Sequence, residues 1–72
     1  MAKRPRIRAI LAKNVRRLRL AKGLSQDALA ADAGLFQKLI SGIENGRANP
    51  ELDTLGKIAD ALGVQPGDLF EE

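Results

Sequence analysis

The chain has 72 residues, a formal net charge of +3, and neither cysteine nor histidine. This length allows one small domain, and the missing residue types exclude disulfides, the usual zinc ligands and histidine-based catalysis. Apolar runs such as residues 9–12 are far shorter than the ~20 residues that span a membrane. We therefore expect a cytoplasmic protein that is not an enzyme, with no cofactor, metal or membrane contact.

Charge is distributed unevenly along the chain. Residues 1–22 contain nine Lys or Arg and no acid, whereas residues 23–72 contain three Lys or Arg and nine acids, so the two parts carry +9 and −6. A small domain polarised in this way presents a basic end to a polyanion, although basic residues can also simply keep a helix solvated. We expect residues 1–7 to form a flexible basic arm that either crosses a nucleic-acid backbone or remains a solvated tail.

Helical periodicity predicts a first helix over about residues 8–22, where apolar residues recur every three or four positions. Ser25 is a suitable N-cap for a second helix over about residues 26–32. Gly34 then allows the positive φ that ends a helix. The apolar stripe of the first helix consists of Ile7, Leu11, Val15 and Leu18.

A third helix is expected over about residues 37–45, with Ile40 and Ile43 facing inward and a polar, weakly basic face opposite them. A fourth helix over about residues 52–62 ends at Gly63, and Pro66 suits the start of a last short helix at 66–70. The expected buried stripe of the fourth helix is Leu52, Leu55, Ile58, Ala59 and Leu62. The predicted fold is all-α, a compact bundle of five short helices over residues 8–72 with no strand.

Residues 26–45 have the pattern of a helix-turn-helix. Ala30 is small where two steeply crossing helices must approach, and Gly34 permits the turn between them. Apolar residues on both helices then fix the pair to the rest of the domain. An ordinary helical hairpin is the alternative interpretation. The residues expected to fix the pair are Leu29, Leu35, Ile40 and Ile43.

In this register the chain resembles the lambda-repressor and Cro-like helix-turn-helix family, also called the xenobiotic-response-element family, over residues 11–70. The matching stretches are residues 14–19, 23–26, 29–30, 33–35, 40–46 and 49–50, followed by Leu55, residues 58–59, 61–64 and 69–70. The resemblance implies a transcriptional regulator that binds double-stranded DNA through the third helix in the major groove. Within the family, residues 40–44 are most similar to restriction-modification controller proteins.

The resemblance also implies residue roles. Arg19 and Glu44 match a structural ion pair, and an acid beside the apolar Ile43 would be costly without a cation or donor. Gln37 matches the first base-reading position, where a glutamine can pair with adenine, and Lys38 and Ser41 can reach bases or phosphates. The residues expected to contact the DNA backbone are Gln26, Asn45, Arg47, Arg16, Arg17, Lys3, Arg4 and Arg6.

Three residues depart from the family pattern. Phe36 replaces the usual Ser or Thr cap of the third helix, Leu39 replaces a polar or aromatic residue, and Gly42 leaves a base-reading position without a side chain. Phe36 and Leu39 can touch thymine methyl groups, or they can pack against neighbouring helices or a partner molecule. A protein-interaction module that uses these two residues as a patch is the competing functional interpretation.

One recognition helix covers few bases, so we expect a homodimer on a two-fold operator. The expected dimer interface lies at the end of the fourth and fifth helices, with Val64, Leu69 and Phe70, although Leu69 and Phe70 can instead close the core. We expect no small-molecule ligand. Regulation would then follow the concentration of the chain itself, as in an autoregulatory repressor or a controller protein.

Overall fold

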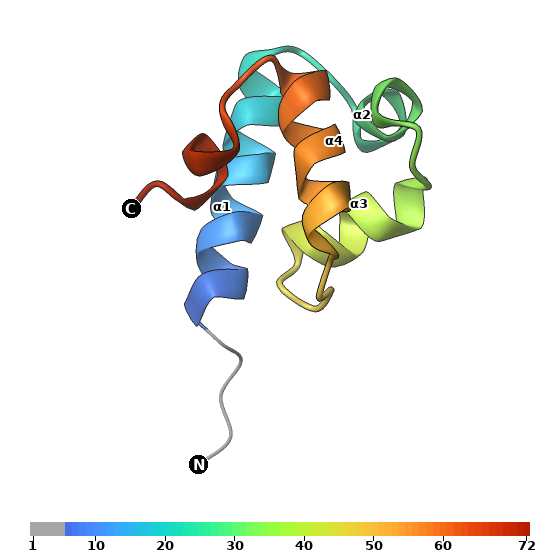
Figure 1. Cartoon of the computed structure of the whole chain (residues 1–72). Helices are drawn as coiled ribbons and strands as arrows, with labels where there is room; N and C mark the ends of the chain where they lie inside the picture. Colours follow the sequence, from blue (N-terminus) through green and yellow to red (C-terminus); the bar gives the residue numbers. More distant parts are fainter. Residues whose placement is uncertain (1–5) are drawn as a thin grey trace.

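The computed structural model describes residues 6–72 and contains no strand in that range. The predicted all-α bundle of short helices is confirmed, with the last helix of the 3-10 type. In Figure 1, α2 and α3 lie to the right of α1, and η1 lies to its left. The elements are α1 (Arg6–Ala21), α2 (Gln26–Ala33), α3 (Gln37–Glu44), α4 (Leu52–Leu62) and η1 (Pro66–Phe70).

The helix ends are determined locally by caps. The Ser25 hydroxyl accepts a hydrogen bond from the Ala28 amide at 3.0 Å and begins α2. Gly34 and Gly63 end α2 and α4 in the left-handed conformation, with φ of 70° and 71°. The bounds of α4 and η1 agree with the prediction, whereas α1 begins at Arg6, two residues earlier than expected. Arg6 and Ile7 are therefore helical, and the remainder of the expected arm lies outside the described residues.

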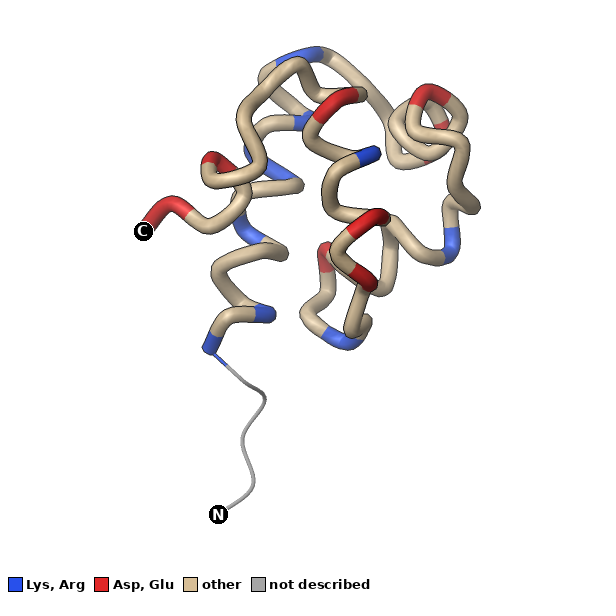
Figure 2. Tube along the Cα trace, viewed as in Figure 1, with Lys and Arg blue, Asp and Glu red and all other residues tan. Residues whose placement is uncertain are grey.

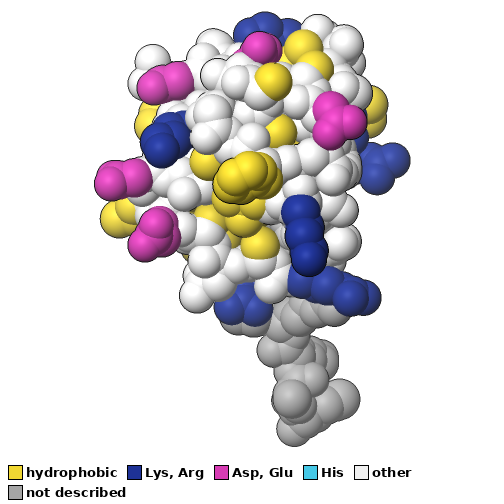
Figure 3. Space-filling model, turned by 90° about the vertical axis from the view of Figure 1, so that its right-hand side faces the viewer, with side chains coloured by type: hydrophobic (Ala, Val, Ile, Leu, Met, Phe, Trp, Pro, Cys, Tyr) yellow, Lys and Arg dark blue, Asp and Glu magenta, His cyan; other side chains and the backbone are white. Residues whose placement is uncertain are grey.

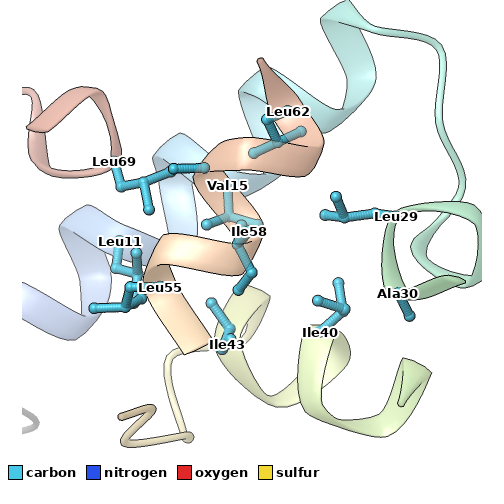
Figure 4. Close-up of a cluster of buried hydrophobic side chains, with 11 residues drawn as sticks. Leu11, Val15, Leu29, Ala30, Ile40, Ile43, Leu55, Ile58, Leu62 and Leu69 are labelled. Carbon is cyan, nitrogen blue, oxygen red and sulfur yellow. The ribbon is translucent and has the colours of Figure 1, made fainter. Parts of the chain in front are cut away.

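The core lies where α1, α4 and η1 meet the α2–α3 pair, and aliphatic side chains from all five elements fill it (Figure 4). Two residues that were expected in buried stripes are exposed instead, Ile7 at 57% and Leu52 at 84%. Both lie in the first turn of their helices, one turn before Leu11 and Leu55, the first buried residues of those helices. The buried cluster consists of Leu11, Val15, Leu29, Ala30, Ile40, Ile43, Leu55, Ile58, Ala59, Leu62 and Leu69.

Asn14 joins α1 to the chain after α4. Its side chain is buried, and its Nδ2 donates to the main-chain carbonyls of Leu69 at 3.0 Å and Glu71 at 2.8 Å. Its Oδ1 accepts from Arg17 at 3.1 Å, so the amide is satisfied on both sides. This role was not predicted, although Asn14 lies three residues after Leu11 on the apolar stripe, where a polar residue needs internal partners.

Candidate nucleic-acid interface

The turn between α2 and α3 holds the two helices as one unit. Gly34 takes a positive φ, and the following Leu35 amide donates to the Ala30 carbonyl at 2.8 Å. Ala30 is buried where the helices pack, and a larger side chain there would separate them. Ile40 and Ile43 turn one side of α3 into the core with 0% and 1% exposure. The opposite side of α3 is therefore directed outward by packing on both flanks.

The outward side of α3 carries the residues predicted to touch DNA. Gln37 and Lys38 are exposed, Ser41 is half-buried, and Asn45 and Arg47 are exposed just after the helix. On the face of the molecule formed by α2 and α3, Lys and Arg side chains gather at the lower right, and most Asp and Glu side chains lie to the left (Figure 3). The exposed groups on α3 and just after it, which are amides and two cations, are of the kind that a DNA backbone and base edges require.

Arg19 and Glu44 form the buried ion pair that the resemblance implies. Arg19 Nε and Nη2 donate to the two Glu44 oxygens at 2.6 and 2.9 Å, and the two side chains are 9% and 3% exposed. A third bond runs from Arg19 Nη1 to the Leu24 carbonyl at 2.8 Å. The hydrogen bonds to Glu44 raise the pKa of Arg19 above its ordinary value, burial opposes them, and the charge of Glu44 adds to them. The pair fixes the end of α3 to α1.

Two glutamines extend this ion pair to the surface. Gln26 Nε2 donates to Glu44 Oε1 at 3.2 Å, and Gln37 Nε2 donates to Gln26 Oε1 at 2.7 Å. A carboxylate only accepts, so the Gln26 amide must point its nitrogen at Glu44 and its oxygen at Gln37. The bond to Gln26 uses one N–H of the exposed Gln37 and leaves its oxygen and its second N–H outside this chain of hydrogen bonds. These are the donor and acceptor that a glutamine offers to adenine in the major groove.

Other predicted contact residues are not gathered with this group. Arg17 donates to Asn14 on the η1 side of α1, and Arg6 pairs with Glu72. Arg16 is exposed on α1, where basic residues are most frequent along the described chain (Figure 2). Lys3 and Arg4 lie outside the described residues. The described contact residues thus divide between the α2–α3 face and α1.

The three departures from the family pattern have different surroundings. Phe36 is the N-cap of α3, makes no side-chain cap hydrogen bond and is 85% exposed. Leu39 is half-buried and packs against the core. The Gly42 carbonyl accepts hydrogen bonds from the Arg47 and Ala48 amides. A Cβ atom on Gly42 would lie 3.4 Å from the Cβ atom of Ala48. Of these three residues, only Phe36 therefore presents a large apolar side chain to solvent.

The expected dimer residues also differ from one another. Leu69 has 0% exposure within this chain, so it closes the core and offers no surface to a partner. That part of the predicted interface is wrong, because the Asn14 bonds hold residues 69–71 against α1 and turn Leu69 inward. Val64 is half-buried against the core, and Phe70 is half-buried at the edge of an apolar groove.

A model of the helix-turn-helix family HTH_3 matches residues 15–69 of this sequence. The chain belongs to this family. The match includes α2, the turn and α3, together with the end of α1, α4 and most of η1, which support them. The chain is a helix-turn-helix transcriptional regulator, which is not an enzyme class.

Control protein C.BamHI from Bacillus amyloliquefaciens is 46% identical over 66 residues, which cover 90% of this chain and 82% of that protein. The controller protein C.AhdI from Aeromonas hydrophila has a crystal structure that superposes with a TM-score of 0.85 and 40% identity, covering 88% of this chain and 96% of that chain. A hypothetical transcription factor from Neisseria superposes with a TM-score of 0.89 and 39% identity, covering 99% and 85%. The resemblance inferred from the sequence is therefore confirmed.

Within residues 6–72, no helix has the length and apolar character needed to cross a membrane. No group of three or more acidic side chains in this range is arranged to hold a metal ion.

Proposed function

We propose that this regulator reads a DNA operator by inserting α3 into the major groove. The observation that carries the proposal is the Gln37–Gln26–Glu44–Arg19 chain of hydrogen bonds, which orients the exposed Gln37 amide before any DNA arrives. An amide that is already oriented loses less conformational freedom on binding a base. Gln37, Lys38 and Ser41 would contact base edges.

The proposed backbone contacts come from both ends of the α2–α3 unit. Gln26 at the start of α2 bonds to Gln37, and the amide of Arg47, after α3, bonds to the Gly42 carbonyl at 2.9 Å. Asn45, at the end of α3, would add a further contact. Such contacts fix the register of the protein on the duplex without reading its sequence. Arg16, Arg17 and Arg6 on α1 would supply longer-range attraction to phosphates.

The test is to select bound duplexes from a random pool and then measure the affinity for the selected duplex at several salt concentrations. We expect a steep fall in affinity with salt, and Arg47→Ala should reduce the slope by about one. Gln37→Ala should instead relax the preference for one base pair in each half-site. Lys57→Ala on α4 removes the same charge outside the proposed contact residues and serves as the matched control. Failure to select any duplex at low salt would refute the proposal and favour a protein-interaction module.

The proposed regulator acts as a homodimer on a two-fold operator, because one eight-residue α3 contacts too few bases for selective binding. An apolar groove of about 260 Å³ on the α1, α4 and η1 side is the best candidate for the interface. The exposed Leu52 and Ile7 lie at this groove, and a surface that holds both a protrusion and a hollow can pair with its own copy. The groove is lined by Ile7, Arg8, Leu11, Asn49, Pro50, Leu52, Leu55 and Phe70.

Leu52→Asp tests the proposed interface. Leu52 is 84% exposed, so the change should leave the fold intact but shift the sedimentation coefficient from that of a dimer to that of a monomer. Leu20→Asp is the control, because Leu20 is 55% exposed on α1 and does not line the groove. A dimer that tolerates Leu52→Asp would show that the chain pairs through another surface.

For the regulated system, we propose the controller type, in which the protein controls its own gene. The support is the similarity to control proteins over nearly the whole chain. When the DNA upstream of the protein's own coding sequence is joined to a reporter gene, the level of reporter expression should change when the protein is expressed. Gln37→Ala should remove that response without lowering the level of folded protein. An unresponsive reporter would argue against autoregulation but not against DNA binding.

A further inference from the structure

We infer that Phe36 is a specificity-determining residue that recognises the C5-methyl group of a pyrimidine in the major groove. The inference rests on the DNA-binding mode proposed above and names the chemical group that one further side chain reads. It assigns to Phe36 alone a role that the sequence left divided between Phe36 and Leu39.

The Phe36 side chain is neither buried in the core nor bonded as a helix cap. Its ring is 85% exposed, the highest value among the large hydrophobic residues described as exposed. It also occupies the N-cap of α3 without capping it, although Ser, Thr, Asp or Asn there would bond to a free amide of the first turn. Phe36 therefore gives up both apolar burial and a helix cap at one position, which is expected where a residue serves binding instead of stability.

Phe36 lies next to the residues predicted to read bases. It directly precedes Gln37, whose amide is fixed by Gln26 at 2.7 Å, and the exposed Lys38 follows. Hydrophobic surface lies in the middle of the α2–α3 face, between the basic and acidic side chains (Figure 3). Leu39 is half-buried against the core, and Phe36 does not line the groove proposed for dimerisation. The ring is thus available to the ligand that Gln37 and Lys38 contact.

The major groove suits an apolar side chain at this position. Its floor presents hydrogen-bond donors and acceptors and one apolar group, the C5-methyl of thymine, which phenylalanine contacts favourably. Insertion between base pairs is the other use of an apolar side chain on DNA, but such wedges act from the minor groove. A ring beside Gln37 therefore matches a pyrimidine methyl next to the base that Gln37 reads. 5-Methylcytosine carries the same methyl at the same ring position.

The experiment uses the duplex selected by the unaltered protein and replaces each thymine in turn by deoxyuridine, which lacks only the methyl. Burying one methyl contributes about 0.8 kcal/mol. Replacing the contacted thymine in one half-site should therefore lower the affinity about fourfold, and replacing it in both half-sites should lower it about fifteenfold. With cytosine at that position, adding the C5-methyl should restore about fourfold. Affinity is measured by fluorescence anisotropy at one fixed salt concentration.

Phe36→Ser is the decisive variant, because serine caps α3 and so keeps the domain folded. The ratio of affinities for the thymine and deoxyuridine duplexes should fall to about one in Phe36→Ser. The same ratio should stay at about four in Leu20→Ala, which removes a comparable exposed side chain from α1.

Two results would overturn the inference while leaving DNA binding in place. The first is that every thymine tolerates deoxyuridine, and the second is that Phe36→Ser keeps the full thymine preference, which would assign the methyl contact to another side chain. If Phe36→Ser loses binding to another protein but keeps the ratio of affinities for the thymine and deoxyuridine duplexes, the ring is instead a partner-binding group. Absence of any bound duplex would overturn the proposed function together with this inference.

Discussion

Two ion pairs tie α1 to distant parts of the chain in opposite surroundings. Arg19 and Glu44 join α1 to the end of α3 with side chains 9% and 3% exposed. Arg6 and Glu72 join the start of α1 to the residues after η1 with side chains 75% and 56% exposed. Arg19 also donates a hydrogen bond to the Leu24 carbonyl, and its partner Glu44 accepts one from Gln26.

The difference lies in what remains when one partner is removed. Loss of Arg19 leaves a carboxylate enclosed by protein, whereas loss of Arg6 leaves a carboxylate in water. The exposed pair is also screened by salt, and the enclosed pair much less so. The same two residue types therefore define the geometry of the recognition helix in one region and add little in the other.

The largest expected effect comes from breaking the enclosed pair. Arg19→Ala should lower the free energy of unfolding by about 3–5 kcal/mol, more than any other Arg→Ala change in the chain. Urea unfolding of the full arginine series measures this directly. Equal midpoints across the series would contradict the comparison.

Because a domain of this size has little stability to lose, Arg19→Ala can unfold it altogether. The double variant Arg19→Met with Glu44→Leu removes both charges and fills their volume, and it should recover most of the stability. The same variant should still bind DNA more weakly, since Gln26 loses its carboxylate partner. Recovery of full affinity would show that Gln37 does not need this orientation.

The next effect concerns Asn14, the second buried polar link of α1. Asn14→Ala leaves the carbonyls of Leu69 and Glu71 without their donor and should cost about 1–3 kcal/mol. Amide hydrogen exchange should increase around η1 before it increases in α2 and α3. Uniform exchange across the domain would indicate that the link is not local.

A smaller effect of opposite sign is expected at Phe36. Phe36→Ser should raise the free energy of unfolding by about 0.5–1 kcal/mol, because the hydroxyl can bond to a free amide at the start of α3. Phe36→Ala serves as the control, since it removes the ring without adding a cap. Thermal melts that place serine below alanine would contradict the capping argument.

The smallest effect is expected at the exposed pair. Arg6→Ala should change the free energy of unfolding by less than about 0.5 kcal/mol. Raising the salt concentration from 0.1 to 1 M should remove even that difference while leaving the cost of Arg19→Ala nearly unchanged. A large, salt-insensitive loss at Arg6 would remove the distinction between the two pairs.

The helices were predictable because local signals determine them. The spacing of apolar residues with Gly63 predicts α4, and Pro66 predicts η1, both with the observed bounds, and Ser25 predicts the start of α2. The Arg19–Glu44 pair followed from the family resemblance, supported by the cost of an acid beside Ile43. In each case the interaction lies within a few residues or within a pattern shared by a family.

The burial of individual side chains was less predictable from the sequence. Periodicity assigns Ile7 and Leu52 to the inner stripes, but it does not state how far the neighbouring elements cover each helix, and both residues are exposed. Leu69 was expected at an interface because the path of the last residues depends on Asn14, a contact across 55 positions of sequence. The hydrogen bond between Gln26 and Gln37 likewise depends on how α2 and α3 cross.

The Asn14 link has a consequence for how the last residues can vary. Its two bonds are made to main-chain oxygens, which every amino acid provides. The route of the polypeptide after η1 is therefore held in place whatever side chains it carries at the exposed positions 71 and 72. Those two side chains can be exchanged without any change in the support beneath the main chain.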